Sequence, residues 1–371
     1  MRIGIDCRLW GETGVGRYLR NLITELRVLD NENDYVLFIL PKDKDDAGLN
    51  FPDSRFAIKQ VSIRWHTINE QIKFPGIIEK ENVDIMHFPY FSVPLLYRKP
   101  FVVTIHDLII NHYPTGQAST LPYPLYWAKL QAYRYIISHA ARHAASVIAV
   151  SKATKQEIMD HFSIPQQNIT VTYEGVDEKV VLIKGKDCRI DIKNYFLYVG
   201  NAYPHKNLKT LITAFAIIRQ EHSDLSLVLI GKDDFFSRRL QKEHSKTPGL
   251  LFKKVEDDQE LSCYYKHARA LVMPSFMEGF GLPPLEAMAN DCLVLCSDIP
   301  SLKEVCSTAA IYFDPKNISD LAEKMNDVIS LTPKQKERFL RSGAERVKEF
   351  SWRKMAEETL MVYKRSVVHS A

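Results

Sequence analysis

Short apolar runs alternate along this chain with segments whose apolar residues recur every three or four positions. In the first half, such runs predict buried strands at Arg2–Asp6, Tyr35–Leu40, Val83–Phe88, Phe101–Ile105 and Ser146–Val150. The intervening segments have helical spacing: one helix is expected to open at Gly14, and Ser151 is placed to cap another. This alternation predicts an α/β fold with a parallel sheet.

A charged connector at 176–191 interrupts the pattern, and a second alternating series follows it. Here a helix is expected from Lys206 to Arg219, with strands at Tyr195–Val199, Leu225–Ile230, Leu271–Met273 and Leu293–Cys296. At 371 residues the chain exceeds the size at which one core usually keeps growing. We therefore expect two doubly wound domains, with a ligand bound beyond the carboxyl ends of their strands.

The composition is that of an ordinary globular protein, with 46% hydrophobic and 25% charged residues. A net charge of +4 does not indicate nucleic acid, and it is compatible with anionic ligands. No run of about 18 apolar residues occurs, and the N-terminus enters a strand without a signal-peptide core, so we expect a cytoplasmic protein. The six cysteines form no C-x-x-C pair and are expected to be buried free thiols.

The stretch from Pro274 to Ala289 combines the end of a strand, a glycine turn and the start of a helix. Gly279 and Gly281 permit a tight loop whose amides can approach a ligand, and the positive end of the helix dipole favours an anion there. Glu278 precedes the loop and Glu286 is expected in the first helical turn after it, so each could bind hydroxyls on either side of a phosphate. This describes a sugar nucleotide. The alternative is an ordinary turn followed by a glutamate that stabilises the helix dipole.

The string Glu-Gly-Phe-Gly-Leu-Pro-Pro-Leu-Glu-Ala-Met-Ala at 278–289 resembles the E-x7-E signature of retaining GT-B glycosyltransferases, the "glycosyl transferases group 1" family (family four). The resemblance covers nearly the whole chain and implies two facing Rossmann-like domains with an interdomain cleft. It implies an acceptor domain at 1–185, braced by a crossover helix in 351–371, and a nucleotide-sugar-binding domain at 186–350. Glu278 would hold the donor sugar and Glu286 the ribose. Further donor contacts are implied at Val255, Gly279, Phe280, Gly281 and Leu282.

Lys206 is expected at a helix start, where a cation is unfavourable unless an anion offsets it. The alternative is a solvated lysine. The family places a lysine at this spacing against the leaving diphosphate, where it would stabilise the charge that develops. Asn201 replaces the family's usual arginine, and both Asn201 and His205 are expected in the donor site. The second diphosphate cation stays open between His205, Lys232 and Arg17.

Gly14 and Gly16 belong to a glycine loop that fits neither common nucleotide fingerprint. Leu19 stands where the dinucleotide motif requires glycine, and Arg17-Tyr18 replaces the Lys-Ser/Thr pair of a Walker A loop. In the family, a glycine loop at this position closes over the donor phosphate, and we expect the same role here.

His106 ends a predicted strand in the string Thr-Ile-His-Asp. A lone histidine at a strand end is more often structural. The string nevertheless resembles that of the family's histidine beside the anomeric carbon, so we expect His106 to position the donor and not to act as a base. His87, at the end of the preceding strand, is expected to be structural.

Three features could suggest metal or membrane binding. His139 and His143 have the spacing of two metal ligands but no third ligand, which favours a basic helix face. The only Asp-x-Asp string, Asp43-Lys44-Asp45, lies in a charged loop and is interpreted as solvated, so we expect no metal requirement. The segment 125–144 mixes aromatic and basic residues; packing in the first domain is favoured over peripheral contact with the inner face of a membrane.

Together these features predict retaining transfer of a hexose from a nucleoside diphosphate sugar to a hydroxyl of a glycan or lipid-linked acceptor. No cofactor beyond the donor substrate is expected. Strings such as Tyr-Pro-His-Lys-Asn-Leu at 203–208 look similar to bacterial polysaccharide-building members, which favours mannose and GDP-mannose over UDP-sugars. Two alternatives remain: a nucleotide-sugar epimerase of the same fold, which would need no acceptor, and a non-catalytic sugar-nucleotide-binding partner.

Overall fold

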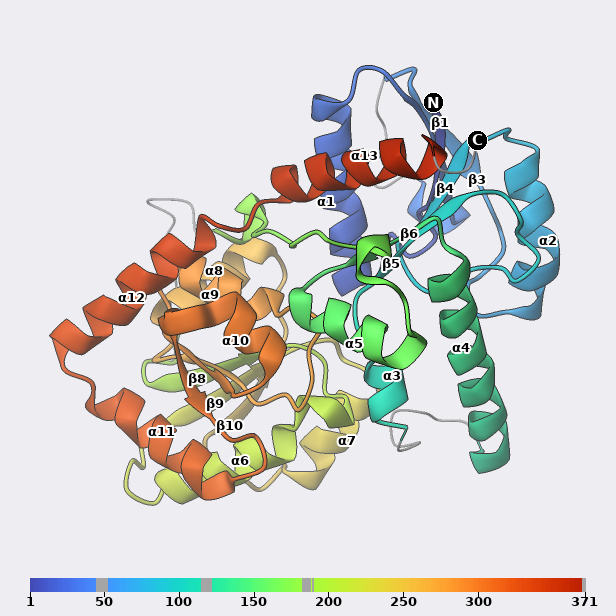
Figure 1. The fold of residues 1–371 in the computed structure, drawn as a ribbon. Coiled ribbons are helices and arrows are strands. Elements are labelled where there is room, and N and C mark those ends of the chain that lie inside the picture. Colours follow the sequence, from blue (N-terminus) through green and yellow to red (C-terminus); the bar gives the residue numbers. More distant parts are fainter. Residues whose placement is uncertain (45–52, 115–121, 182–187, 189, 369–371) are drawn as a thin grey trace. The chain divides into compact units, whose positions relative to one another are not determined.

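The protein is described by a computed structural model that covers residues 1–44, 53–114, 122–181, 188 and 190–368. The described residues divide into two compact units (Figure 1). The first unit comprises 1–114, 122–174 and 352–368 of these residues, and the second comprises 175–351. Each unit contains its own parallel sheet with helices. The α/β fold class predicted from the alternating pattern is thus confirmed.

Within the described residues, the first unit has a seven-stranded parallel sheet in the order β3-β2-β1-β4-β5-β6-β7. Its strands are β1 (Arg2–Asp6), β2 (Asp34–Ile39), β3 (Phe56–Gln60), β4 (Ile85–Phe88), β5 (Phe101–Ile105), β6 (Ser146–Ala149) and β7 (Ile169–Val171). Its helices are α1 (Gly14–Leu29), η1 (Pro41–Asp43), α2 (Ile68–Glu79), α3 (Ile109–His112), α4 (Tyr123–His143), α5 (Lys152–Phe162), η2 (Gln166–Asn168) and α13 (Trp352–Val368).

The described part of the second unit has a six-stranded parallel sheet in the order β10-β9-β8-β11-β12-β13. Its strands are β8 (Tyr195–Val199), β9 (Ser226–Ile230), β10 (Leu250–Lys253), β11 (Leu271–Met273), β12 (Val294–Ser297) and β13 (Ala310–Phe313). Its helices are η3 (Glu178–Val180), η4 (Pro204–Lys206), α6 (Leu208–Ile218), α7 (Phe235–Glu243), α8 (Asp258–His267), α9 (Leu282–Ala289), α10 (Pro300–Cys306), η5 (Ser307–Ala309), α11 (Ile318–Ser330) and α12 (Pro333–Val347).

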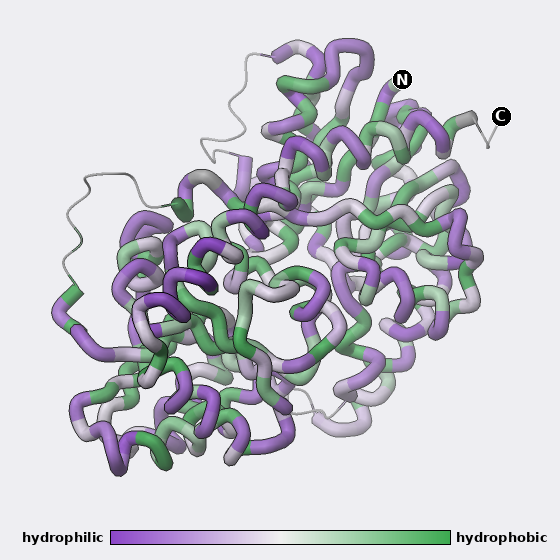
Figure 2. The backbone as a smooth tube through the Cα atoms, turned by 60° about the vertical axis from the view of Figure 1, so that its left-hand side comes forward, coloured by the Kyte–Doolittle hydropathy of each residue, from purple (hydrophilic) through white to green (hydrophobic). Residues whose placement is uncertain are grey.

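The central strands are mostly apolar because helices cover both faces of a parallel sheet. All five residues of β5 and all three residues of β11 are buried. Figure 2 shows hydrophobic stretches running through the interior of each unit and hydrophilic stretches mainly on its outside. Four strands, β1, β5, β8 and β11, have the bounds that the sequence predicts. Ser151 caps α5 as predicted, since its Oγ accepts a hydrogen bond of 3.0 Å from Thr154 N.

Helix α13 follows the second unit in sequence but belongs to the first, where it packs against α1, β4, β5 and β6 (Figure 1). Its polar contacts with the first unit include two with residues of the sheet. Tyr363 Oη and His87 Nδ1 share a buried hydrogen bond of 2.6 Å, and Ser366 Oγ donates to Ser146 Oγ at 2.9 Å. The chain therefore enters the second unit once and returns. The functional assignment of the two units to acceptor and donor, with a cleft between them, stays a prediction.

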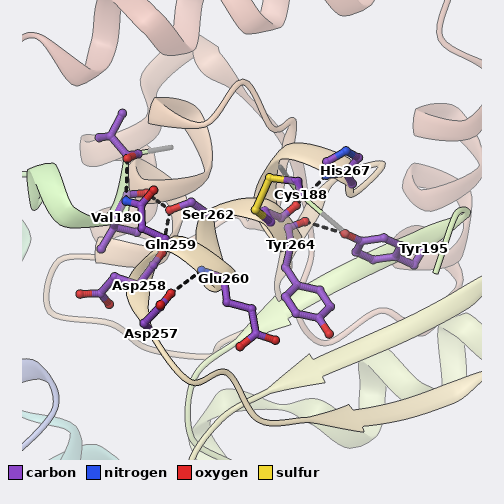
Figure 3. Close-up of a disulfide and its surroundings, with 12 residues drawn as sticks. Val180, Cys188, Tyr195, Asp257, Asp258, Gln259, Glu260, Ser262, Tyr264 and His267 are labelled. Atoms are coloured by element: carbon purple, nitrogen blue, oxygen red, sulfur yellow. Dashed lines mark hydrogen bonds between the residues drawn. A yellow bond between two sulfur atoms is a disulfide. The ribbon is translucent and has the colours of Figure 1, made fainter. Parts of the chain in front are cut away.

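Cys188 and Cys263 form a disulfide (Figure 3), so the expectation of free thiols is wrong for this pair. The remaining four cysteines are free and buried, as expected: Cys7, Cys292, Cys296 and Cys306. The disulfide joins the connector that follows the first unit to α8. Ser262 Oγ, also on α8, donates to Val180 O, so two described residues of the connector, Val180 and Cys188, contact α8.

Candidate active site

The strand order of the second sheet reverses between β8 and β11, which are neighbours although they are far apart in sequence. In open parallel sheets, ligands bind at such a reversal, beyond the carboxyl ends of the strands. Lys206 follows β8, in η4, and Glu278 follows β11, in the loop before α9. The two residues predicted to carry the chemistry therefore come from the two strands that flank the reversal.

Lys206 and Glu278 form an ion pair in the structure. Lys206 Nζ donates to Glu278 Oε1 at 2.8 Å and to Oε2 at 2.9 Å. The side chains are 13% and 9% exposed, so the pair is neither buried in the core nor freely solvated. Such a position strengthens the attraction relative to a surface pair and still leaves access for a charged ligand.

The segment that carries Lys206 also holds the loop that carries Glu278. Phe276 N donates to His205 O at 2.8 Å. Asn207 Nδ2 donates to Pro274 O at 3.0 Å and to Pro315 O at 2.8 Å, and Asn207 is buried. Asn207 adopts the left-handed conformation with φ of 57° and precedes α6. Lys206 therefore lies before that helix, and the expectation that the helix begins at Lys206 is wrong.

Helix α9 begins directly after the glycine turn. Gly281 is its N-cap with φ of +112°, and a Cβ at this position would lie 2.7 Å from Leu302 Cδ2, so both conformation and space require glycine. Pro283 and Pro284 lie in the first turn, as predicted, because their missing amides are not needed there. Glu286 is the fifth residue of the helix. The expectation that it lies in the first turn is wrong, because the helix starts at Leu282.

Glu286 is almost fully buried, at 2% exposed. Tyr265 Oη, on α8, donates to Glu286 Oε2 at 2.8 Å. Phe280 in the glycine turn is also buried, and its ring packs edge-on against Phe350 with centroids 5.5 Å apart. The side chain of Phe280 therefore anchors the turn. Amide contacts of Gly279, Phe280, Gly281 and Leu282 with a donor stay predictions, as does a base contact at Val255, which lies between β10 and α8.

His205 precedes Lys206 and was one candidate for the second diphosphate cation. Burial, with the neighbouring Lys206 ammonium, lowers the pKa of His205 to about 4, against a smaller opposing effect of Glu278. The ring is therefore neutral near pH 7 in this structure. Asn201 O accepts a hydrogen bond of 2.6 Å from Tyr198 Oη, which fixes the loop after β8. Lys232 and Arg17 remain open as the second cation.

His106, in the first unit, has both ring nitrogens beside oxygen acceptors. Its Nε2 lies 3.0 Å from Pro89 O, and its Nδ1 lies 3.2 Å from Glu174 Oε1. A general base needs a nitrogen that is not engaged in this way, which favours a positioning role. That role stays a prediction, and Glu174 is a partner that the sequence did not reveal.

The glycine loop of the first unit opens α1. Gly14 is the first residue of the helix and has open space around it. Gly16 lies against the backbone, where an added Cβ would be 2.4 Å from Trp10 O. Gly16 thus has a packing reason to be glycine, whereas the contact of either residue with a donor phosphate stays a prediction.

Metal and membrane features give a mixed outcome. Among the described residues, no group of three or more His, Cys, Asp or Glu side chains could hold a metal ion. His143 Nδ1 lies 2.9 Å from His139 O on α4, an ordinary contact within a helix. Asp43 is less solvated than expected, with its side chain 12% exposed, and Asp45 lies outside the described residues. No helix in the described ranges is both long and apolar enough to cross a bilayer.

Segment 125–144 forms most of α4, which buries Leu130, Ile137, Ala140 and Ala141 in the first unit. Packing in the first unit, the favoured interpretation, therefore accounts for the buried residues of α4. The opposite side leaves Leu125 and Tyr135 exposed. Peripheral membrane contact through this helix stays a prediction.

Sequence reasoning missed the side chains that hold the two glutamates. Ser275 Oγ donates to Glu278 Oε1, and Ser275 is fully buried. Tyr265 holds Glu286 from another helix. The one available signal was the position of Ser275 three residues before Glu278, which would have been compatible with a local hydrogen bond.

Two family models match the chain in succession. The model of Glycosyltransferase Family 4 matches residues 13–180, and the model of Glycosyl transferases group 1 matches residues 186–346. The chain belongs to the group 1 (family four) glycosyltransferases. It is therefore a glycosyltransferase of a retaining family that uses nucleotide-sugar donors, and its fold is of the GT-B class.

The curated relatives of this group 1 glycosyltransferase are distant. It is 26% identical to the O-antigen chain mannosyltransferase RfbU of Salmonella typhimurium, over 68% of this chain and 66% of that relative. It is also 26% identical to the O-antigen chain mannosyltransferase B of Escherichia coli, over 76% of this chain and 74% of the relative. Its fold is similar to that of a sucrose-phosphate synthase from Thermosynechococcus elongatus, with a TM-score of 0.78, 18% identity and 98% of each chain covered.

Proposed function

We propose that this glycosyltransferase moves a mannosyl residue from GDP-mannose to a hydroxyl of a growing glycan or lipid-linked acceptor, with retention at the anomeric carbon. The mannosyl assignment is supported by the two O-antigen mannosyltransferases to which the chain is similar. The role of the site is supported mainly by one observation: the Lys206–Glu278 ion pair at the strand-order reversal, beside the start of α9.

The geometry of the pair suggests how a donor would bind. A diphosphate near the amides of residues 279–282, in the glycine turn and at the start of α9, would attract the Lys206 ammonium by charge. Glu278, released from part of its ion pair, would accept hydrogen bonds from hydroxyls of the sugar. Glu286, held by Tyr265, would accept from the ribose. Each carboxylate then recognises hydroxyls on one side of the diphosphate.

In the transfer step, the bond between the anomeric carbon and the β-phosphate oxygen breaks, and its electron pair stays on the diphosphate. The acceptor oxygen forms a new bond to the anomeric carbon on the same face. The acceptor proton passes to the departing phosphate oxygen. Lys206 would stabilise the negative charge that builds on the phosphate, an effect that is strongest where water is largely excluded.

The donor is tested by thermal-shift measurements with GDP-mannose, UDP-glucose and UDP-N-acetylglucosamine. A donor present at about a hundred times its dissociation constant should stabilise the protein by about 2.7 kcal/mol. We expect GDP-mannose to stabilise it most. Transfer is then followed as GDP release that depends on an added mannose-terminated acceptor, and the anomeric configuration of the product is read by NMR.

Three outcomes would contradict the proposal. Stabilisation by a UDP-sugar and not by GDP-mannose would overturn the donor assignment. Conversion of the donor sugar without any acceptor would indicate an epimerase. Donor binding with no turnover on any acceptor would instead favour a non-catalytic binding partner.

A further inference from the structure

Ser275 is a buried residue whose hydroxyl serves the candidate site. It lies just beyond the carboxyl end of β11 and is 0% exposed. Its Oγ donates to Glu278 Oε1, the same oxygen that accepts from Lys206 Nζ at 2.8 Å. Among the described residues, Oε1 thus accepts two side-chain hydrogen bonds and Oε2 accepts one, at 2.9 Å from Lys206. A carboxylate oxygen can accept two, so Oε2 has room for a ligand hydroxyl.

The position of Ser275 is fixed on both sides. The carbonyl of Pro274, before it, accepts from Asn207 Nδ2 at 3.0 Å. The amide of Phe276, after it, donates to His205 O at 2.8 Å. The backbone on both sides of Ser275 is therefore held by His205 and Asn207, through contacts that do not involve the Lys206 side chain.

The two contacts of Glu278 differ in how they respond to a ligand. The Lys206 contact is ionic, and a diphosphate competes for the same ammonium. In the Ser275 contact, a neutral hydroxyl donates to the carboxylate, and a diphosphate that is bound by Lys206 and the amides of residues 279–282 does not replace it. If Lys206 turns toward the phosphates, the hydrogen bond from Ser275 still orients the Glu278 carboxylate. A charge-assisted hydrogen bond of this kind is among the stronger side-chain contacts.

We propose that Ser275 is a positioning residue: it holds Glu278 Oε1 on the protein side so that Oε2 faces a hydroxyl of the donor sugar. This inference rests on the proposed function, because it assumes that the site binds a nucleoside diphosphate sugar. It assigns different roles to the two side chains that contact Glu278. Lys206 binds the diphosphate, and Ser275 keeps the sugar-binding carboxylate in place while Lys206 is bound to the phosphates.

The test compares a sugar nucleotide with its nucleotide alone. Dissociation constants are measured by calorimetry for GDP-mannose and GDP, and for UDP-glucose and UDP, on the full chain and on Ser275→Ala. Loss of one hydrogen bond to a charged group should weaken the sugar nucleotide by about tenfold. Affinity for the nucleotide alone should stay unchanged, because Ser275 acts only through Glu278 on the sugar. The KM for the donor should rise with the same ratio.

Ser297→Ala is the matched control. Ser297 is also 0% exposed and ends the neighbouring strand β12, but its Oγ donates to the backbone at Met273 O, 3.2 Å away. This variant should change neither affinity. A second measurement guards against a general folding effect: in the Glu278→Gln background, Ser275→Ala should weaken the sugar nucleotide by much less than tenfold, because the carboxylate that it positions is gone.

Each result has a distinct meaning. Equal loss of GDP-mannose and GDP in Ser275→Ala would show a disturbed loop and overturn the positioning role. Wild-type affinities in Ser275→Ala would overturn it alone and leave the proposed function intact. A wild-type protein that binds neither GDP-mannose nor UDP-glucose would overturn the proposed function and this inference together.

Discussion

The two units place polar side chains at the carboxyl ends of their central strands, but these side chains have different partners. In the first unit, His87 is fully buried between Tyr363 Oη at 2.6 Å and Thr104 Oγ1 at 2.8 Å. In the second unit, Lys206 and Glu278 pair with each other at a position that remains partly exposed. The first arrangement uses neutral groups, and the second uses opposite charges.

A second polar cluster of the first unit lies after β1 and contains charged side chains. Arg8 is 1% exposed, and its Nη2 contacts both Glu70 Oε1 and Asp6 Oδ2 at 2.6 Å. Ser92 Oγ completes the set by donating to Glu70 Oε2 at 2.8 Å. Arg8, Glu70 and Ser92 are buried, and the side chain of Asp6 is 12% exposed. This cluster is interpreted as one that maintains the fold, whereas the Lys206–Glu278 pair is proposed to exchange partners with a ligand.

The largest expected effect comes from disrupting the charged cluster of the first unit. Glu70→Ala leaves Arg8 buried with one carboxylate, which should lower the free energy of unfolding by about 3–5 kcal/mol. All four tryptophans of the chain lie in the first unit, at positions 10, 65, 127 and 352, so urea unfolding followed by tryptophan fluorescence reports on that unit. Glu79→Ala, at an exposed position of the same helix, is the control and should change stability by less than about 0.5 kcal/mol.

The second effect concerns catalysis and should leave stability nearly unchanged. Glu278→Ala removes the carboxylate proposed to bind the donor sugar, and kcat/KM for transfer should fall by about a hundred- to a thousandfold. Its control is Glu337→Ala, where an exposed carboxylate pairs with Arg341 at 3.3 Å. Full transfer activity in Glu278→Ala would show that the Lys206–Glu278 pair is no more functional than the surface pair.

The third prediction uses pH to separate the units. Burial, with a smaller contribution from His106, lowers the pKa of His87 to about 3, so the ring is neutral in the folded unit and takes up a proton only in the unfolded chain below about pH 6.5. Stability from this group is therefore complete above pH 6.5 and is lost as the pH falls toward 3. Between pH 7 and pH 5, wild-type protein should lose about 2 kcal/mol more than His87→Gln.

Tryptophan-detected unfolding at the two pH values measures that difference. His66, whose pKa burial lowers to about 4, titrates in the same direction but is present in both proteins. An equal pH dependence in the wild type and in His87→Gln would show that His87 is protonated in the folded unit.

The smallest expected effect distinguishes the ribose-binding part of the candidate site from the sugar-binding part. Tyr265→Phe removes the hydrogen bond to Glu286, which is proposed to bind the ribose, so GDP and GDP-mannose should both bind about tenfold more weakly. This differs from Ser275→Ala, which should affect only the sugar nucleotide. Tyr195→Phe is the control, because Tyr195 Oη donates to a backbone carbonyl, Tyr264 O, at 2.8 Å (Figure 3). A selective loss of GDP-mannose in Tyr265→Phe would contradict the assignment of Glu286 to the ribose.

The sequence was most informative where the physical signal is local. Strands β8 and β11 are continuous apolar runs, and their bounds were predicted correctly. The glycine turn and the two prolines before Glu286 were likewise legible as a helix start. By contrast, the edge strands were not predicted. Polar residues interrupt the apolar runs of β3, β7 and β10, and all four edge strands, β13 included, are only partly buried.

Contacts between distant segments could not be predicted in this way. Cys188 and Cys263 are 75 residues apart, and nothing in six scattered cysteines identifies the pair. The ion pair of Lys206 with Glu278 spans 72 residues, and only the family resemblance suggested that both residues serve one site. The first-turn placement of Glu286 failed because helix boundaries depend on the left-handed Gly281, which a pattern of apolar residues does not reveal.

The hydrogen bonds of His205 O and Asn207 Nδ2 to the 274–276 loop have a consequence for protein engineering. Segments 204–207 and 274–278 behave as one part although the chain separates them. Recombination with a relative of different donor preference should therefore transfer both segments from the same parent. A crossover point placed anywhere between them would combine halves that never evolved to fit.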